Sequence, residues 1–564
     1  MRAATLAIVV ACVALAGRAQ HQYEQVLLQP PVGATRPKRI AIVGLGAGGI
    51  TALHSLMLLP EDMRQGWQVT VFEEREAPGG IWLPQDDPPP PPGIPRTPLY
   101  LNIRTNGPHP SLTVPNTPLA PNTPLLASRD AVLKYWEAIL NSTTLTPQTT
   151  IWLKHSVTSA KWIGSSSSGQ WNLNVTNLMH NKTDSFAFDH LIAAPGINGI
   201  PRVPYIEGQD GWVKSGKLLM HSMWYRDPHI FGNKTVLIVG GGPSGLDIAR
   251  HSVRSANKVY WARNSPRPGR PNWPPVPGVQ VVDRFESLSN GVATLTGGST
   301  LPEVDAVVLC TGYQVKVPFL TKGGFLDEVD EVDGAQTQNQ LTTNSRYIYP
   351  LYEHTLSLDS RYPVGALYIS SLLTYNPTGS TSLAQGLFAA YTIADPTLLG
   401  TREELLAALK KREELVRQSG GDPAKLGHQV GVGYGALFGH RDAGPFQDLL
   451  VHSLRDRGLA GYPGIPEYGF NFTETWRVYA VVHTLSILEG WHTRLAAEGD
   501  AWEAEYTSGL RTEADYLDSM RRFVTWWSQN KQKYSTSGVA PSEERHLPSQ
   551  IVTFALAPTC LSID

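Results

Sequence analysis

A glycine-rich segment near the start of the chain constrains its fold more than any other feature. Residues 40–43 form a short apolar run typical of a buried parallel strand, and Gly44, Gly46 and Gly49 follow it in G-x-G-x-x-G spacing. The first glycine of this pattern permits a tight turn, the second lets a pyrophosphate approach the backbone, and the third lets helix and strand pack closely. Residues 50–59 then have the pattern of a helix, whose first N–H groups would face the phosphates. The segment predicts a dinucleotide-binding unit.

An acidic residue indicates which nucleotide this unit prefers. Residues 69–72 have the pattern of the second strand, and Glu73 comes directly after them. A carboxylate at this point can accept hydrogen bonds from both hydroxyls of a ribose, and it would repel a 2′-phosphate. Glu73 therefore favours an adenosine with a free ribose, as in FAD or NAD.

The same pattern recurs later in the chain with the opposite charge after the second strand. Gly240, Gly242 and Gly245 follow an apolar run in G-x-G-x-x-G spacing, and residues 258–262 have the pattern of the next strand. Arg263 then stands where the first unit carries an acid, and an arginine here can pair with a 2′-phosphate. The second unit therefore favours NADP over NAD. Two further candidates for this contact are Arg267 and Arg270.

A unit suited to FAD and a unit suited to NADPH predict a flavoprotein that receives hydride from a nicotinamide. We expect an α/β fold with two Rossmann-like dinucleotide-binding domains, the second inserted in the first, and a helical C-terminal extension. The expected boundaries are 1–19 for a signal peptide, 38–208 and 321–400 for the two parts of the FAD-binding domain, 209–320 for the NADPH-binding domain, and 401–564 for the helical region.

Other segments give weaker expectations. Four runs are predicted to form one antiparallel sheet, namely 150–153, 157–163, 171–175 and 185–188. Residues 86–98 contain five consecutive prolines and are expected to form a stiff surface excursion. The helices of the C-terminal region are expected to pack on the FAD-binding domain and to help enclose a pocket.

The N-terminus has the pattern of a secretory signal peptide. Met1 and Arg2 precede an apolar run over residues 3–16, and small residues with candidate cleavage sites follow. The run is shorter than the roughly 20 residues that span a bilayer, so a cleaved signal is favoured over an uncleaved anchor and no stable membrane span is expected. We therefore expect a secreted glycoprotein. Its candidate glycosylation sites are Asn141, Asn174, Asn181, Asn233 and Asn471, of which Asn233, just ahead of a buried strand, fits least well.

Charge and cysteine content exclude several classes of function. The 564 residues include 47 Lys and Arg against 49 Asp and Glu, a balance that gives no reason to expect nucleic acid as a partner. Of the three cysteines, Cys12 belongs to the signal, Cys310 lies in an apolar strand, and Cys560 is far from both. Without a close pair, a disulfide reductase is disfavoured, and no cluster predicts a metal site. Oxygen or a quinone remains as the electron acceptor.

Seven short segments in this order resemble the class B flavin monooxygenases, the group of the flavin-containing and Baeyer–Villiger monooxygenases. The similarity spans about residues 38–394 and leaves the proline run and the C-terminal third unexplained. The segments are GLGAGG at 44–49, FEE at 72–74, GGIW at 79–82, RTN at 104–106, HSMWY at 221–225, GGGPSG at 240–245 and VVLCTGYQVKVPFL at 307–320.

The resemblance implies a mechanism and a set of site residues. In that family reduced flavin and O2 form a C4a-hydroperoxide, and bound NADP+ protects it. Asn106 would then be the catalytic residue, beside the C4a and N5 edge of the flavin. Further contacts with FAD are implied for Glu73 at the ribose, for Trp82 at the flavin or adenine, and for the backbone of Val157 at the adenine. His221 and Tyr225 would lie in the linker that carries NADP, Ser244 and Arg263 would bind its phosphates, and Thr105 and Gly312 would be further cofactor contacts.

The chain departs from the family pattern at two places. The F-x-G-x-x-x-H fingerprint lacks its Phe, and Gly216 is one residue too far from His221. Residues 194–196 read Ala-Pro-Gly in place of Ala-Thr-Gly. Tyr225 resembles the flavin-containing form, but position alone leaves hydroxylation and Baeyer–Villiger insertion both open.

The signal peptide makes the chain similar to the secretory members found in fungal pigment and polyketide clusters. By that analogy alone, the substrate would be a small lipophilic aromatic polyketide, with partner enzymes of the same pathway. Two alternatives stay open: an NADPH oxidase or quinone reductase on the same fold, and a non-catalytic flavoprotein partner of a secreted enzyme complex.

Overall fold

The computed structural model describes residues 37–263, 276–288, 291–330, 332, 339–374, 376–428 and 445–536. The predicted signal peptide lies outside these residues, as do Cys12, Arg267, Arg270 and Cys560. Within the described ranges, no helix is both long enough and apolar enough to cross a membrane.

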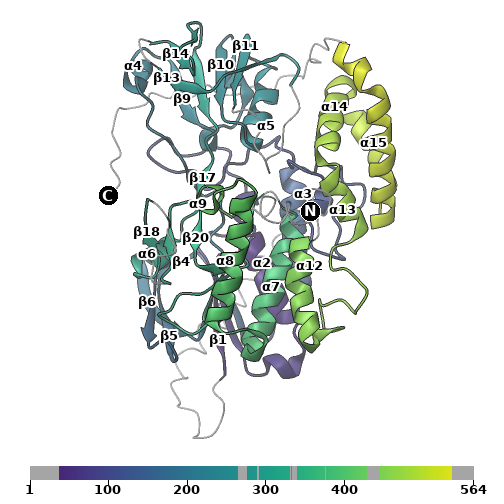
Figure 1. Ribbon diagram of the computed structural model, residues 1–564. Coiled ribbons are helices and arrows are strands. Elements are labelled where there is room, and N and C mark those ends of the chain that lie inside the picture. The colour runs from purple at the N-terminus through teal and green to yellow at the C-terminus, as the bar shows by residue number, and fades with distance from the viewer. Residues whose placement is uncertain are drawn as a thin grey trace, which may run out of the picture.

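The first dinucleotide unit is built on a seven-stranded sheet in the lower lobe of Figure 1. Its order is β21-β22-β23-β7-β1-β2-β3, and β1 lies between β2 and β7 with all three parallel. The chain returns to add β23 beside β7 only after the second domain, so the second domain is inserted in the first. The strands are β1 (Arg39–Val43), β2 (Gln68–Glu73), β3 (Thr149–Leu153), β7 (His190–Ala193), β21 (Leu351–Tyr352), β22 (Leu356–Ser357) and β23 (Leu367–Ile369).

Helices cover one face of this sheet and a small antiparallel sheet covers the other. On the helical face, α2 (Ala47–Leu58) packs on α7 (Thr378–Ala394), and α3 (Arg129–Ser142) lies beside α2. On the opposite face, Trp162 and Trp171 of the antiparallel sheet share a core with the inward residues of β1 and β7. That sheet consists of β4 (His155–Gly164), β5 (Gly169–Asn177) and β6 (Lys182–Phe188).

The prediction of a four-stranded antiparallel sheet is wrong in one strand. Residues 150–153 belong to β3, which pairs in parallel with β2 at the edge of the large sheet. Lys154, with φ of +57°, turns the chain between β3 and β4, so the two runs enter different sheets.

The second dinucleotide unit forms the upper lobe of Figure 1. Its five strands are all parallel, in the order β12-β11-β10-β16-β9, and α5 (Pro243–Ser252) follows the central strand β10. The two connections between the lobes pair with each other as β8 (Ile200–Pro201) and β17 (Tyr313–Gln314). The five strands are β9 (Leu218–His221), β10 (Thr235–Val239), β11 (Lys258–Ala262), β12 (Val279–Val282) and β16 (Ala306–Leu309).

The C-terminal helices divide between the two domains, which corrects the expectation that all pack on the first. Among them, α12 (Pro445–Leu454) packs on α7 in the first domain. The others, α13 (Thr475–Val482), α14 (Thr484–Thr507) and α15 (Glu513–Thr536), run along one side of both lobes (Figure 1). Trp491 and Ile487 of α14 belong to one buried cluster with Leu246 and Ala249 of α5.

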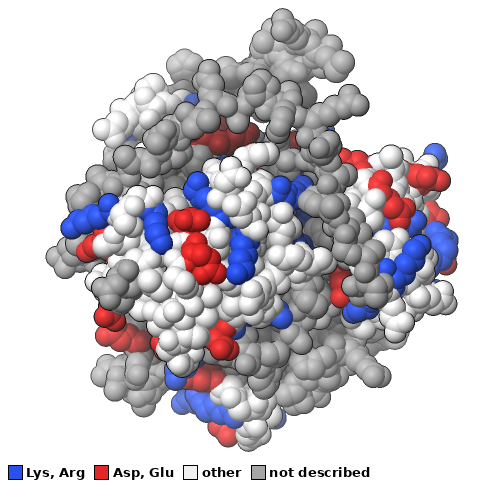
Figure 2. Space-filling view, turned by 90° about the horizontal axis from the view of Figure 1, so that it is seen from above, with Lys and Arg blue, Asp and Glu red and all other residues white. Residues whose placement is uncertain are grey.

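The remaining elements are short, apart from α8 (Arg402–Gln418), which lies against β21. Seen from above, the described surface carries Lys and Arg intermixed with Asp and Glu (Figure 2). The short elements are α4 (Gln209–Lys214), α6 (Pro318–Lys322), α9 (Pro423–Leu426), β13 (Phe285–Ser287), β14 (Ala293–Leu295), β15 (Thr300–Leu301), β18 (Asp327–Glu328), β19 (Thr342–Thr343) and β20 (Ile348–Tyr349).

Candidate functional site

The first glycine loop has the close packing that its spacing predicts. Gly44 has φ of +99°, its amide donates to Phe72 O at 2.8 Å, and a Cβ on it would overlap the carbonyl of Ala194. A Cβ on Gly49 would overlap the carbonyl of Gly44. Both glycines are therefore required for the turn between β1 and α2.

The N-terminus of α2 fits a pyrophosphate. Gly46 is the N-cap residue, and within the described residues no side chain caps this end of the helix. Gly80 lies opposite, so that a Cβ on Gly46 would be 3.3 Å from Gly80 Cα. The first N–H groups of α2 therefore have no described side-chain cap, and the backbone beside Gly46 is that of another glycine, which suits an anion at the positive end of the helix dipole.

Glu73 is tied to this loop. Its Oε2 accepts a hydrogen bond from Leu45 N at 2.6 Å and its Oε1 accepts one from Arg75 N at 2.9 Å. The side chain is buried, and burial raises the pKa of the carboxyl. Glu73 thus shapes the loop directly, and its contact with a ribose stays a prediction.

The other candidate FAD contacts are spread around the first domain. Trp82 is half-buried at the end of the 3-10 turn Gly80–Trp82 and packs on the main core. Val157 lies on β4 where the register with β5 shifts, so the hydrogen-bond ladder is interrupted there. Their contacts with the cofactor stay predictions.

Asn106 is exposed on a segment whose neighbours are fixed. Thr105 N donates to Ala127 O at 2.9 Å, and Thr105 Oγ1 accepts from Ala127 N at 3.1 Å. The same hydroxyl donates to Gly107 O at 2.7 Å. Thr105 and Gly107 are buried while Asn106 is exposed, so the backbone is held and the amide group stays accessible.

The second glycine loop repeats the geometry of the first, with one open position. Gly240 has φ of +126° and a Cβ on it would overlap Cys310 O, while a Cβ on Gly245 would overlap Gly240 O. A Cβ on Gly242, the N-cap of α5, would have no described atom within 4 Å. The described residues supply no side-chain cap to α5 either, so this N-terminus also fits a phosphate group.

Arg263 lies beside this loop. Its guanidinium stacks 4.6 Å above the ring of Trp261, whose Nε1 donates to Gly240 O at 2.8 Å. A Cβ on Gly241 would lie 3.3 Å from Arg263 Cβ. Ser244 is half-buried in the first turn of α5. The loop, Ser244 and Arg263 therefore lie together, as an NADP phosphate site requires.

His221 and Gly312 meet where the two domains join. His221 Nδ1 accepts from Met223 N at 3.1 Å, so Nε2 carries the proton and donates to Gly312 O at 3.1 Å. Burial lowers the pKa of His221 to about 4, so the ring is neutral near pH 7. Both residues hold the linker in place, and their contact with NADP stays a prediction.

Tyr225 lies in the predicted linker, but its side chain is part of the core. The ring is fully buried, nearly parallel to Phe231 at 5.9 Å and edge-on to Tyr100 at 5.0 Å. This placement does not favour the predicted contact between Tyr225 and the cofactor.

Arg226, a residue not predicted from the sequence, connects the proline-rich segment to this linker. Its Nε donates to Gln85 O at 2.9 Å and its Nη2 donates to Thr97 O at 2.9 Å. Trp224 Nε1 donates to Pro89 O at 3.0 Å. The segment is therefore not only a surface excursion, because it packs on the joint between the domains. The only sequence signal for this is that Arg226 follows the HSMWY motif.

Comparison with known proteins agrees with this arrangement. Residues 37–267 match the family model FMO-like, described as flavin-binding monooxygenase-like. Over these residues the chain is similar to the flavin-binding monooxygenases. It is 27% identical over 459 residues to the flavin-containing monooxygenase ustF2 of Aspergillus flavus, covering 67% of this chain and 86% of that protein. It is 28% identical over 294 residues to the trimethylamine monooxygenase of Roseovarius sp., covering 50% and 62%.

The fold is that of solved flavin monooxygenases. The structure of S-allyl-L-cysteine S-oxygenase from Allium sativum superposes with a TM-score of 0.62 at 19% identity, covering 87% of this chain and 99% of that one. Tmm from a Pelagibacter strain gives 0.60 at 20% identity, covering 81% and 93%. These similarities indicate an FAD-dependent monooxygenase with NADPH as electron donor, and each glycine loop leads into a helix N-terminus that no described side chain caps. When bound, the flavin supplies the electrons that activate O2.

Proposed function

We propose that this monooxygenase transfers one oxygen atom from O2 to a small lipophilic substrate at a site bordered by Asn106. The observation that carries the proposal is the exposed Asn106 amide between the buried residues Thr105 and Gly107. An amide N–H carried on a fixed backbone can stabilise negative charge that develops on oxygen. Asn106 would thus favour transfer of oxygen to the substrate over release of peroxide.

The substrate that we propose is an aromatic polyketide, supplied by partner enzymes of a secondary-metabolite pathway and either hydroxylated or oxidised beside a ketone. The support is the analogy with secretory fungal members of the family. The names of three relatives favour a second class, in which sulfur or nitrogen is oxygenated: trimethylamine monooxygenase, thiol-specific monooxygenase of Saccharomyces cerevisiae, and senecionine N-oxygenase of Tyria jacobaeae.

A substrate panel tests both classes. The purified enzyme is given NADPH, O2 and either an aromatic polyketide ketone, a thioether or a tertiary amine, and the oxygenated product and the peroxide are counted per NADPH. We expect the polyketide to give the largest product yield. A yield confined to the thioether or the amine would replace the polyketide proposal with the second class. Peroxide as the only product with all three would favour the NADPH oxidase alternative.

Asn106→Ala tests the role of the amide, with Asn102→Ala as the matched control on a neighbouring exposed residue. We expect Asn106→Ala to bind FAD and accept electrons normally but to release about tenfold more peroxide per product. Asn102→Ala should behave as the wild type. An unchanged product yield in Asn106→Ala would remove Asn106 from the site.

We also propose that the protein passes through the secretory pathway and carries N-linked glycans. The supporting observation is that Asn141, Asn174, Asn181, Asn233 and Asn471 are all exposed. Full-length protein expressed in a fungal host should appear in the medium and increase in gel mobility after endoglycosidase treatment. Retention in the cell without a mobility change would refute the proposal.

A further inference from the structure

One end of the segment around Asn106 is held by helix α14. We call residues 104–117 the Asn106 loop. Arg104 Nη2 lies 2.8 Å from Glu503 Oε2, and Glu503 Oε1 accepts a hydrogen bond from Trp491 Nε1 at 2.7 Å. Glu503 is buried, so this ion pair lies inside the contact between the loop and the C-terminal helices.

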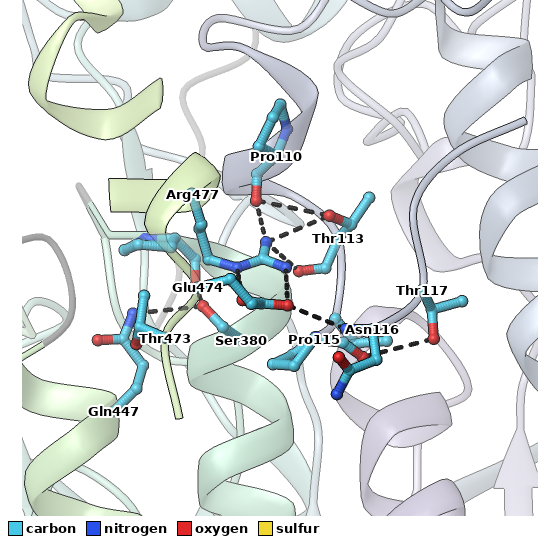
Figure 3. Close-up of polar contacts among 12 residues, drawn as sticks. Pro110, Thr113, Pro115, Asn116, Thr117, Ser380, Gln447, Thr473, Glu474 and Arg477 are labelled. Atoms are coloured by element: carbon cyan, nitrogen blue, oxygen red, sulfur yellow. Dashed lines mark hydrogen bonds and ion pairs between the residues drawn. The ribbon is translucent and has the colours of Figure 1, made fainter. Parts of the chain in front are cut away.

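The other end of the loop is held by α13 through Arg477 (Figure 3). This arginine is fully buried, and its Nη1 donates to Pro110 O, to Thr113 O at 2.6 Å and to Thr113 Oγ1 at 3.2 Å. Its charge is paired with Glu474, whose Oε2 lies 2.9 Å from Arg477 Nε. Glu474 Oε1 in turn accepts from Asn116 N at 2.9 Å, so both members of the ion pair bind loop backbone.

The loop cannot move away from Arg477, because α7 closes its other side. A Cβ on Gly379, in the first turn of α7, would overlap Leu112 O and lie against the backbone of Thr113. Figure 3 shows Thr113 close to the guanidinium of Arg477. Backbone between Pro110 and Asn116 is therefore held between α7 and α13.

A buried guanidinium in this position is costly to remove. Loss of Arg477 would leave the carboxylate of Glu474 without its charge partner, and it would take the buried donor from the carbonyls of Pro110 and Thr113. The backbone would have to rearrange to regain these hydrogen bonds, and such a rearrangement would reach Asn106 within a few residues.

We propose that Arg477, paired with Glu474, is a positioning residue that sets the direction of the Asn106 side chain from the C-terminal helices. The Arg104–Glu503 pair supports the opposite end of the same loop. The inference rests on the proposed role of Asn106 in oxygen transfer. It assigns a function to the C-terminal helices, which lie beyond the residues 37–267 that match the family model.

The test compares Arg477→Gln with Arg477→Lys and with Arg494→Gln. Arg494 is a suitable control because it pairs with Glu498 at 2.8 Å within α14. Three quantities are measured in the FAD-loaded enzyme: the rate of flavin reduction by NADPH, the peroxide released per NADPH, and the hydrogen exchange of peptides covering residues 104–117. Hydrogen exchange is also measured in the enzyme without NADPH or substrate.

We expect Arg477→Gln to be reduced at the wild-type rate, to release about tenfold more peroxide, and to exchange faster in the Asn106 loop. Arg477→Lys keeps the positive charge, so its peroxide release and its exchange in the Asn106 loop should lie between those of the wild type and Arg477→Gln. Arg494→Gln should leave both peroxide release and loop exchange at their wild-type values. Wild-type peroxide release and wild-type exchange in Arg477→Gln would overturn the proposal, as would an equal loss in Arg494→Gln.

A milder variant covers the case in which Arg477→Gln does not fold. Thr113→Val removes only the hydroxyl that Arg477 contacts, and it should shift loop exchange and peroxide release in the same direction by a smaller factor. No shift in either quantity would contradict the proposal. If the wild type itself gives no oxygenated product, the proposed function fails, while the exchange data still decide whether Arg477 holds the loop.

Discussion

The carboxylate of Glu73 accepts a hydrogen bond from the backbone N–H of Leu45 at 2.6 Å, which joins the end of β2 to the first glycine loop. The same carboxylate accepts from Arg75 N, so both oxygens are used by the protein. Glu73 therefore fixes the loop that receives the pyrophosphate, in addition to the ribose contact that its position predicts.

Glu73→Gln should weaken the first loop. The amide group would turn an N–H donor toward Leu45 N or Arg75 N, and one buried donor would lose its acceptor at a cost of about 1–3 kcal/mol. We expect a lower free energy of unfolding and weaker FAD retention, measured by denaturant titration and by flavin release. Glu74→Gln, next to it and exposed, is the control. Equal FAD retention in Glu73→Gln and the wild type would contradict this account of the loop.

Two glycines of the second loop should respond in opposite ways to alanine. A Cβ on Gly245 would overlap Gly240 O, so Gly245→Ala should destabilise the domain, measured as a lower Tm. A Cβ on Gly242 would meet no described atom, so Gly242→Ala should keep its Tm but place a methyl group where the phosphates bind. Its KM for NADPH should rise about tenfold or more. A normal KM in a folded Gly242→Ala would place the coenzyme elsewhere.

Arg263→Ala should reduce the preference for NADPH over NADH. Loss of a charge-assisted contact with the 2′-phosphate costs about 1.5–3 kcal/mol, which corresponds to a change of roughly 10- to 100-fold in relative kcat/KM. Lys258→Ala at the other end of β11 is the control, because its ammonium pairs with Glu303. If the ratio of kcat/KM for the two coenzymes stays at its wild-type value in Arg263→Ala, a different residue reads the phosphate.

Acid should destabilise the protein partly through His221. Burial lowers its pKa from 6.5 to about 4, so the unfolded chain binds a proton at higher pH than the folded one. Stability is therefore full above pH 6.5 and is lost as the pH falls from 6.5 towards 4, by up to about 3 kcal/mol for this group. His221→Gln cannot be protonated and should give a shallower dependence of unfolding free energy on pH in that range. A slope as steep as that of the wild type would show that other groups carry the effect.

The sequence predicts the parts of this molecule that depend on local spacing. The strand, glycine loop and helix at residues 39–58 follow from short-range packing, and the same applies to the second loop. Residues 150–153 are wrongly predicted to join the antiparallel sheet, because the runs 149–153 and 155–164 have the same strand pattern. The turn between them depends on a positive φ at Lys154, a residue type that rarely adopts it.

The support of the candidate site could not be predicted in the same way. Arg477 and Thr113 are 364 residues apart in the chain, and neither has a local pattern that indicates their contact. Tyr225 is the opposite case. A sequence motif places it in the linker, but the motif does not reveal that its ring is buried in the core. Side-chain direction at a domain joint depends on tertiary packing.

The most direct test of the central claim follows the flavin after O2 is added. Purified enzyme is reduced with NADPH without air and mixed with oxygenated buffer, and the absorbance spectrum is recorded in a stopped-flow instrument with and without excess NADP+. A monooxygenase should show a transient spectrum distinct from reduced and oxidised flavin, and NADP+ should lengthen its lifetime. A single-step return to oxidised flavin, with one peroxide released per NADPH and no effect of NADP+, would contradict the account and favour an NADPH oxidase.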